Sequence, residues 1–168
     1  MAALHIPLQK LETAIREVCR VLEQRDHRVS RWDHMREDDL WRELVACILG
    51  SRVPFQVARA AVERMERANL FAEERRISGY QKYEHDVRCA LTGSVKTGGD
   101  HHIGSPYPFS EQKAQQIRLA AETLYAPRRS IRKLLEHAGD VREARRRLAS
   151  EVSGLGPKQA SLFLRNIG

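Results

Sequence analysis

VSGLGPKQASLFLRNIG, residues 152–168, is the stretch of sequence that decides the fold. Gly154 and Gly156 flank Leu155, so the chain can adopt positive φ here and approach another backbone closely. Pro157 suits the first position of a helix, because its missing N–H needs no partner there. The apolar residues of this helix recur at helical spacing, and Gly168 can cap its end: Ala160, Phe163, Leu164 and Ile167. The stretch therefore predicts two helices joined by a tight glycine turn.

The turn leaves free amide groups at the start of the second helix, and such a helix end attracts anions. A DNA phosphate needs donors at close range, and Lys158 adds a positive charge nearby. The contact would be independent of sequence, because phosphates carry no base identity. A chance glycine turn between two core helices is the alternative, and the pattern GLGPK before an amphipathic helix disfavours it. The hairpin residues expected to contact DNA are Gly154, Leu155, Gly156, Pro157, Gln159 and Ser161.

The composition agrees with a polyanionic partner. The chain has 168 residues, a formal net charge of +7 and a sequence pI near 9.7. This excess of Arg and Lys favours nucleic acid, although a membrane surface or a plain solvated surface would also account for it. No apolar run is long enough to span a bilayer, and residues 1–10 do not look like a signal peptide, so we expect a cytoplasmic, nucleoid-associated protein.

Helical periodicity extends over most of the chain, so we expect an all-α fold in a single domain, 1–168. Within it, 72–108 is expected to be a loop-rich insert and 140–168 the helix-hairpin-helix. An N-terminal helix is expected on Leu8, Leu11, Ile15, Val18 and Leu22. Further helices are expected on Leu40–Leu49, on a segment with Pro54 in its first turn, and on Tyr80–Leu91. Three more are expected: one capped by Ser110, one from Ile131 to Gly139, and one after Asp140, which has capping-box-like spacing to Glu143.

At this point the chain resembles a known family. The segment GLGPKQASLFLRNIG resembles the helix-hairpin-helix motif of the endonuclease III superfamily of DNA glycosylases (HhH-GPD), with the closest likeness to the archaeal-type 8-oxoguanine DNA glycosylases. RELVACILGSRVPFQVARAA (42–61) is similar to the buried helix and following loop of that superfamily. YPFSEQKAQQIRLAAETLY (107–125) resembles the segment in which a lysine–alanine pair, here Lys113 and Ala114, opens a helix. The likeness spans 38–168, with 71–106 unmatched.

The resemblance implies base excision: an N-glycosylase with AP lyase activity that flips a damaged base, 8-oxoguanine by likeness, out of double-stranded DNA. It implies that Lys158 attacks the sugar C1′, forms a Schiff base and nicks the strand by β-elimination. This chemistry needs a neutral amine, so the lysine must be partly desolvated or lie near a base. A lysine that only holds phosphate is the alternative. A non-catalytic DNA-binding module and a structural helical domain that binds a protein are the other functions considered.

Ser51 and Arg52 follow the helix expected on Leu40–Leu49. In relatives this loop faces the DNA, and a glutamine often enters the gap left by the flipped base. Arg52 occupies the matching place, where an arginine could fill the gap and bond to the orphan base. An ordinary solvated arginine is equally compatible with the sequence.

Other polar groups receive simpler interpretations. Asp100, His101 and His102 lie in a glycine-rich loop without a suitably spaced partner, so we expect no metal there and no cofactor. Tyr80 and Tyr83 have the spacing of core residues rather than of a base-stacking pair. The run 145–147, RRR, is expected to form a solvated face.

The family also places an essential aspartate about two helical turns after the hairpin helix. This sequence stops at Gly168 before such a residue. Three accounts are open: a truncated gene or fragment, a second chain or missing C-terminal segment that completes the site, or a shortened protein that only binds DNA. We expect truncation, because the stop falls at a helix end within a recognisable pattern.

Overall fold

The computed structural model describes residues 9, 12–14, 16–17, 20, 31–93 and 106–168. The chain divides into two compact units, Met1–Ser30 and Arg31–Gly168. In the first unit, the Arg20 guanidinium pairs with the Glu17 carboxylate at 2.7 Å. The five apolar positions that predict an N-terminal helix lie outside the described residues.

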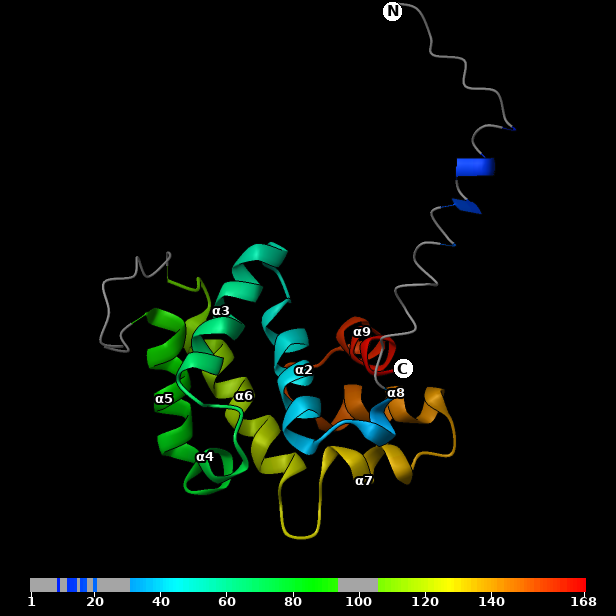
Figure 1. Cartoon of the computed structure of the whole chain (residues 1–168). Helices are drawn as coiled ribbons and strands as arrows, with labels where there is room; N and C mark the ends of the chain where they lie inside the picture. Colours follow the sequence, from blue (N-terminus) through cyan, green and yellow to red (C-terminus); the bar gives the residue numbers. More distant parts are fainter. Residues whose placement is uncertain (1–8, 10–11, 15, 18–19, 21–30, 94–105) are drawn as a thin grey trace, which may run out of the picture. The chain divides into compact units, whose positions relative to one another are not determined.

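The second unit is helical throughout its described residues, with no strand (Figure 1). Its elements are η1 (Trp32–His34), α2 (Glu37–Leu49), α3 (Phe55–Arg67), α4 (Glu73–Ile77), α5 (Tyr80–Thr92), α6 (Ser110–Leu124), α7 (Ile131–Glu136), α8 (Val141–Glu151) and α9 (Pro157–Ile167). This confirms the predicted all-α class. No helix among the described residues has the length and apolar character that crossing a membrane requires.

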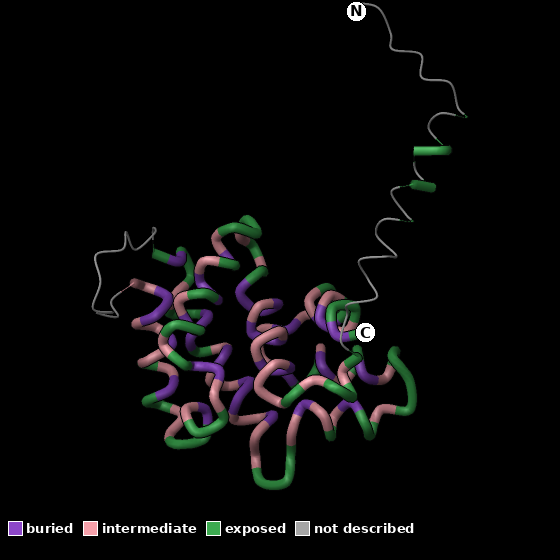
Figure 2. The backbone as a smooth tube through the Cα atoms, viewed as in Figure 1, coloured by how far each residue is buried: buried purple, intermediate pink, exposed green. Residues whose placement is uncertain are grey.

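Helix α2 lies at the centre of this unit, and α3, α6, α7 and α9 pack on it. A helix that is apolar around most of its circumference is buried rather than amphipathic. Figure 2 shows buried residues on the helices around α2. The predicted stripe on this helix is confirmed, since each of its members is fully buried: Leu40, Trp41, Leu44, Val45, Ile48 and Leu49.

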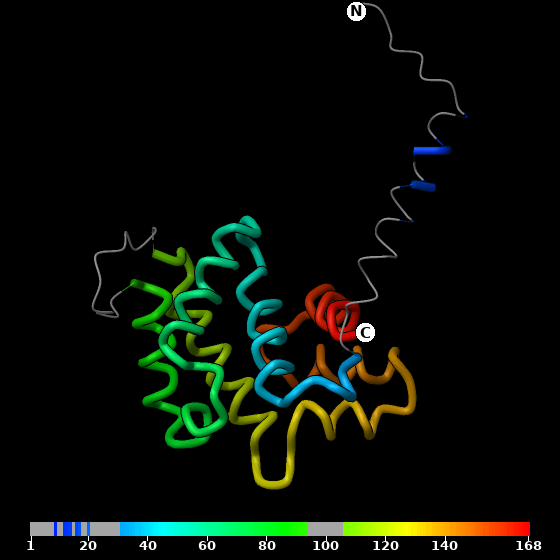
Figure 3. Tube along the Cα trace, in the orientation of Figure 1, coloured from blue at the N-terminus to red at the C-terminus, as the bar shows by residue number. Residues whose placement is uncertain are grey.

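Segments far apart in sequence meet at α2. Figure 3 shows α9, coloured red, beside α2, coloured cyan. The Asn166 side-chain amide donates to the Glu43 carboxylate at 2.7 Å, which ties the end of α9 to α2. The Glu37 carboxylate accepts the Ile131 backbone N–H at 2.7 Å and so fixes the start of α7. These contacts hold the hairpin helix α9 on the core of the unit.

Helix α4 was not predicted from the sequence. The side chain of Arg76 in this helix is fully buried and pairs with Asp38 of α2 at 2.8 Å. Its guanidinium carbon lies 4.5 Å from the centre of the Tyr125 ring, a cation–π contact. The pairing compensates a charge that would otherwise be costly to bury.

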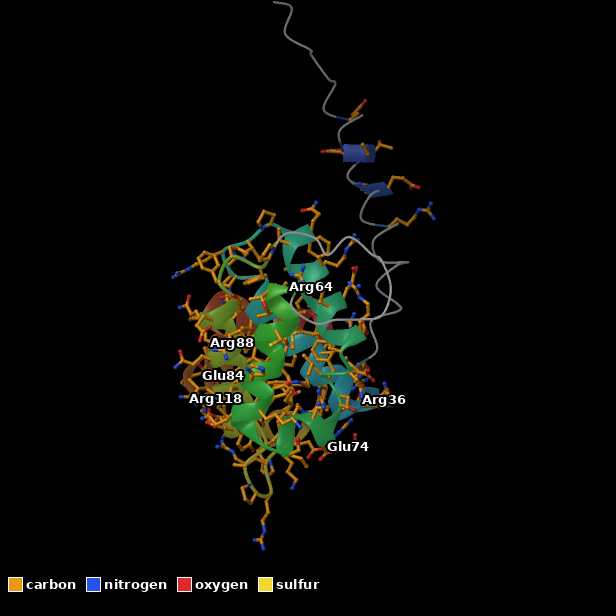
Figure 4. All side chains as sticks on the ribbon, turned by 90° about the vertical axis from the view of Figure 1, so that its left-hand side faces the viewer. Arg36, Arg64, Glu74, Glu84, Arg88 and Arg118 are labelled. Atoms are coloured by element: carbon orange, nitrogen blue, oxygen red, sulfur yellow. The ribbon has the colours of Figure 1, made fainter. Side chains whose placement is uncertain are left out.

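Helices α5 and α6 pack side by side, and their shared face carries paired charges (Figure 4). Arg118 lies between two carboxylates, with N–O distances of 2.5 Å to Glu84 and 2.5 Å to Glu122. Arg88 pairs with Glu111 at 2.9 Å. The positive charges on this face are therefore neutralised within the fold.

Several expected boundaries are corrected. Ser110 does not cap α6: the N-cap is Phe109, with no side-chain cap bond, and Ser110 is the first helical residue. Helix α7 ends at Glu136 rather than Gly139, and Pro54 is the N-cap of α3 rather than a first-turn residue. The helix expected on Tyr80–Leu91 is present as α5.

Candidate nucleic-acid interface

The turn between α8 and α9 has the geometry predicted from its glycines, with one correction. Gly154 has φ of 80°, the left-handed region, whereas Gly156 has φ of −71°, which any residue adopts. Leu155 is 1% exposed, and its side chain packs in the core. Only Gly154 is therefore needed for the backbone conformation of the turn.

Gly154 also allows α6 to approach the turn. A Cβ atom at this position would lie 2.9 Å from Oε1 and 3.1 Å from Cβ of Gln116. A larger residue would push this side chain aside in addition to straining the backbone. Because Gly154 has no side chain, the hairpin turn can lie in contact with α6.

Helix α9 begins with an open N-terminus. Gly156 is its N-cap, Pro157 occupies the first position, and no side chain caps the first turn. Lys158 follows at the second position with its side chain exposed. Within the described part of the chain, no carboxylate pairs with Lys158. The electropositive helix end and the lysine together favour an anion.

A hollow of about 380 Å³ lies against this turn. The loop after α2, the first turns of α6, the end of α8 and the hairpin all contribute to it. Its lining residues are Ser51, Arg52, Phe109, Gln112, Lys113, Gln116, Ala149, Val152, Gly154, Leu155, Gly156 and Gln159. The structure thus brings Ser51 and Arg52 together with four of the hairpin residues singled out from sequence. None of the described lining residues is a carboxylate.

Tyr107, which lies just before α6, forms hydrogen bonds to the ends of α2 and α5. Its buried hydroxyl donates to the Leu49 carbonyl at 2.6 Å, and its backbone N–H donates to the Leu91 carbonyl. Burial raises the pKa of Tyr107 to about 12, so the phenol keeps its proton. The ring of Phe109 packs edge-on against the Tyr107 ring at 6.5 Å between centroids. Phe109 itself is 38% exposed and lines the hollow, a residue that sequence reasoning missed.

Arg52 is exposed and has φ of 67°, a conformation that residues other than glycine rarely adopt. Backbone strain of this kind is concentrated at functional sites. The backbone conformation of Arg52 therefore sets where its side chain starts, at the rim of the hollow.

Lys113 is the second missed residue of the hollow. It lies in α6 and is only 5% exposed. Burial and the nearby Arg52 charge both lower its pKa. The pair Lys113–Ala114 is visible in the sequence, but the burial of the lysine depends on segments distant from it in the chain.

Three predicted residues are not among those that line the hollow: Pro157, Lys158 and Ser161. The Ser161 hydroxyl donates to the Pro157 carbonyl at 2.9 Å and accepts from Arg145 Nε at 2.7 Å. Ser161 lines a separate apolar groove between α7, α8 and α9. Pro157 is exposed at the start of α9.

Tyr83 and Cys47 are buried and do not line the hollow. Tyr83 is buried and donates to the Leu70 carbonyl at 2.9 Å, which confirms its place in the core. Burial raises the pKa of the Cys47 thiol to about 12, so it remains protonated. The described residues contain no group of three potential metal ligands, and residues 100–102 lie outside the described part of the chain.

Comparison with known proteins finds sequences that are similar to this chain. Residues 101–168 match the Ogg-HhH family, described as 8-oxoguanine DNA glycosylase. The 8-oxoguanine DNA glycosylase/AP lyase of Saccharolobus solfataricus is 30% identical over 151 residues, covering 89% of this chain and 60% of the relative. The corresponding protein of Sulfolobus acidocaldarius is 27% identical over 133 residues, covering 79% of this chain and 54% of the relative.

A solved structure shares the fold. The 8-oxoguanine DNA glycosylase of Methanocaldococcus jannaschii matches with a TM-score of 0.62 at 19% identity, over 90% of this chain and 59% of that chain. The chain thus spans about 60% of the length of the relatives that it matches. Sequence and fold together confirm the predicted resemblance: this chain is similar in sequence to archaeal 8-oxoguanine DNA glycosylases and shares the all-helical fold of one of them.

Proposed function

We propose that this chain is a DNA repair glycosylase with AP lyase activity, which holds duplex DNA at its hairpin and uses Lys158 as nucleophile. The observation that carries the proposal is the position of Lys158. It is exposed in the first turn of α9, directly after an N-cap glycine without a side-chain cap. The activity named for the relatives supports the same function.

The DNA contact follows from the hairpin. The first-turn amides of α9 point at an anion, and Gly156 leaves the approach to them clear. The net charge of +7 adds a general attraction to the phosphate backbone. We expect Gly154, Gly156, Pro157 and Gln159 to form this contact without reading the base sequence, while the buried Leu155 side chain holds the turn in place from the core. Ser161, one turn further along α9, would add a contact to the DNA backbone.

The chemistry assigned to Lys158 proceeds in balanced steps. The neutral Nζ attacks C1′ of the damaged nucleotide, the glycosidic bond breaks, and the departing base takes up a proton. The nitrogen, which has given up a proton to the departing base, then opens the sugar ring with its lone pair: the C1′–O4′ bond breaks, O4′ takes up a proton from water, and a Schiff base results. Loss of a C2′ proton and of the 3′ phosphate nicks the strand by β-elimination. Lys158 is exposed in the free chain, so bound DNA must supply the desolvation that favours a neutral amine.

The damaged base and the role of Arg52 are finer parts of the proposal. 8-Oxoguanine is the base named for the relatives. Arg52 stands at the rim of the hollow on a strained backbone, which supports insertion into the gap left by the flipped base. Ser51 precedes it and lines the same hollow.

Borohydride trapping tests the proposal with two duplexes, one with an abasic site and one with 8-oxoguanine. At an abasic site the amine condenses with the C1′ aldehyde and water leaves, so no base has to be expelled. We expect the 168-residue chain to trap the abasic duplex strongly. We expect weak trapping of the 8-oxoguanine duplex, because no carboxylate among the described residues lines the hollow or pairs with Lys158.

Lys158→Gln should abolish trapping of the abasic duplex. Lys82→Gln is the matched control, because Lys82 is an exposed lysine on α5. Undiminished trapping by Lys158→Gln would show that the lysine only holds phosphate. Strong trapping of the 8-oxoguanine duplex by the native chain would show that base removal does not need a carboxylate beside Lys158.

A further inference from the structure

Lys113 is a buried cation without a counter-charge. Its residue is 5% exposed, and it lines the hollow below the hairpin turn. The charge that acts on it is that of Arg52, which, together with burial, lowers the pKa of Lys113. Among the described residues, no carboxylate pairs with it. Burying an ammonium group beside a second cation is unfavourable unless an anion joins them.

Arg76 and Arg118, one fully and one partly buried, both have carboxylate partners. Arg76, fully buried, has Asp38 at 2.8 Å. Arg118, on the same helix as Lys113, has Glu84 and Glu122, each at 2.5 Å. Lys113 departs from this pattern, so the missing partner at the hollow is a specific property of this site.

Two helix N-termini open onto the same hollow. Helix α6 begins at Phe109, Ser110, and α9 begins at Gly156, Pro157; neither has a side-chain cap. Phe109 and Gly156 both line the hollow. Each helix end carries roughly half a positive charge, so the two ends and the two side chains together favour a negative ligand. The volume of about 380 Å³ leaves room for a phosphate group, which is much smaller.

We propose that Lys113 and Arg52 bind one phosphate in this hollow, a phosphodiester of the DNA strand held beside the hairpin. This assignment rests on the proposed function for the identity of the strand. It makes Lys113 a DNA-binding residue of α6. In this arrangement Arg52 contacts a backbone phosphate at the rim instead of entering the gap left by the flipped base, so the two roles of Arg52 are alternatives. A free phosphate ion shares the same chemistry and would occupy the same groups.

The test measures binding and stability on the same variants of the 168-residue chain. The probes are a fluorescein-labelled undamaged 20-base-pair duplex, titrated over a range of salt, and inorganic phosphate alone. Lys113→Met keeps the length of the side chain and removes its charge. Lys82→Met, at an exposed position of α5, is the matched control.

We expect Lys113→Met to weaken duplex binding about tenfold and to lower the salt slope by about one, the loss of one phosphate contact. Its thermal midpoint should rise by about 2–4 °C, because an unpaired buried charge is removed. Arg52→Gln, at an exposed position that cannot disturb the core, should weaken duplex binding similarly. Lys82→Met should leave binding and midpoint unchanged.

Native duplex affinity and salt slope in both Lys113→Met and Arg52→Gln would overturn the phosphate site and leave the proposed function standing. If Lys113→Met does not fold, the result for Arg52→Gln decides. A chain that binds inorganic phosphate through Lys113 but does not bind the duplex would retain the phosphate site and overturn the proposed function.

Discussion

The first turn of α8 is closed by side chains, whereas the first turn of α9 is open. At α8 the Asp140 carboxylate accepts the Glu143 N–H at 2.7 Å, and the Glu143 carboxylate accepts the Gly139 N–H at 3.0 Å. At α9 the N-cap is a glycine, the next residue is a proline, and no side chain reaches the first-turn amides. The N-termini of the two hairpin helices therefore differ: the first-turn amides are bonded to side chains in α8 and are left without a side-chain partner in α9. A capped end contributes to stability, and an uncapped end retains donors for a ligand.

The largest effect is expected from Gly154→Phe, which disrupts the open end. A side chain here strains a backbone at φ of 80° and displaces Gln116 of α6. Duplex binding should fall by about a hundredfold or more, measured by fluorescence anisotropy at low salt. Gly93→Phe is the matched control, because Gly93 has φ of 78° at the end of α5. Equal losses in the two variants would mean that general destabilisation, rather than the hairpin, explains the effect.

Gly156→Asp converts the open end into a closed one. Gly156 has ordinary backbone angles, and an added Cβ would meet only Gln159 Oε1 at 3.5 Å, so the variant should fold. The new carboxylate would cap the first-turn amides and repel phosphate, so duplex binding should fall about tenfold or more while thermal stability is kept or improved. Gly156→Ala supplies neither cap nor charge and should bind nearly as the native chain does. Native affinity in the aspartate variant would show that the α9 amides do not face DNA.

Asp140→Ala opens the closed end. Loss of this cap should lower the free energy of unfolding by about 1 kcal/mol, measured by urea denaturation. Duplex binding should stay within about twofold of native, because α8's start lies outside the lined hollow. A loss of binding similar to that of Gly156→Asp would remove the distinction between the two helix ends.

The smallest effect concerns the pH dependence of stability at the open first turn of α6. The pKa of Lys113 is lowered from 10.5, so between its lowered value and 10.5 the unfolded chain binds more protons than the folded chain. The free energy of unfolding should therefore rise with pH in this window through Lys113. The rise should be smaller in Lys113→Met, as judged from urea denaturation of both proteins at several alkaline pH values. Identical pH profiles would indicate that Lys113 is not desolvated in the folded chain.

Local sequence signals predicted the elements whose determinants lie close together in the chain. The stripe of α2, the capping pair Asp140 and Glu143, and the turn at Gly154 each depend on residues within one helix or turn. Ser110 shows the limit of this reasoning, since a residue type that often caps helices lies here one position inside α6.

Features that depend on distant partners could not be predicted. Helix α4 reads EERRI and has no apolar stripe; Arg76 is buried because Asp38 and Tyr125 meet it from other helices. Lys113 is buried because the loop at Arg52 and the hairpin turn close over the start of α6. A single lysine in a polar segment gives no sign of this burial in the sequence.

The role of Lys158 is tested most sharply by identifying the residue that becomes attached to an abasic site. The chain is incubated with an abasic duplex and borohydride, digested with protease and nuclease, and the adduct is located by mass spectrometry. The open first turn of α9 predicts that the reduced sugar is attached to Lys158. Attachment to the N-terminal amine, to Lys82 on α5 or to several lysines at similar levels would contradict the account.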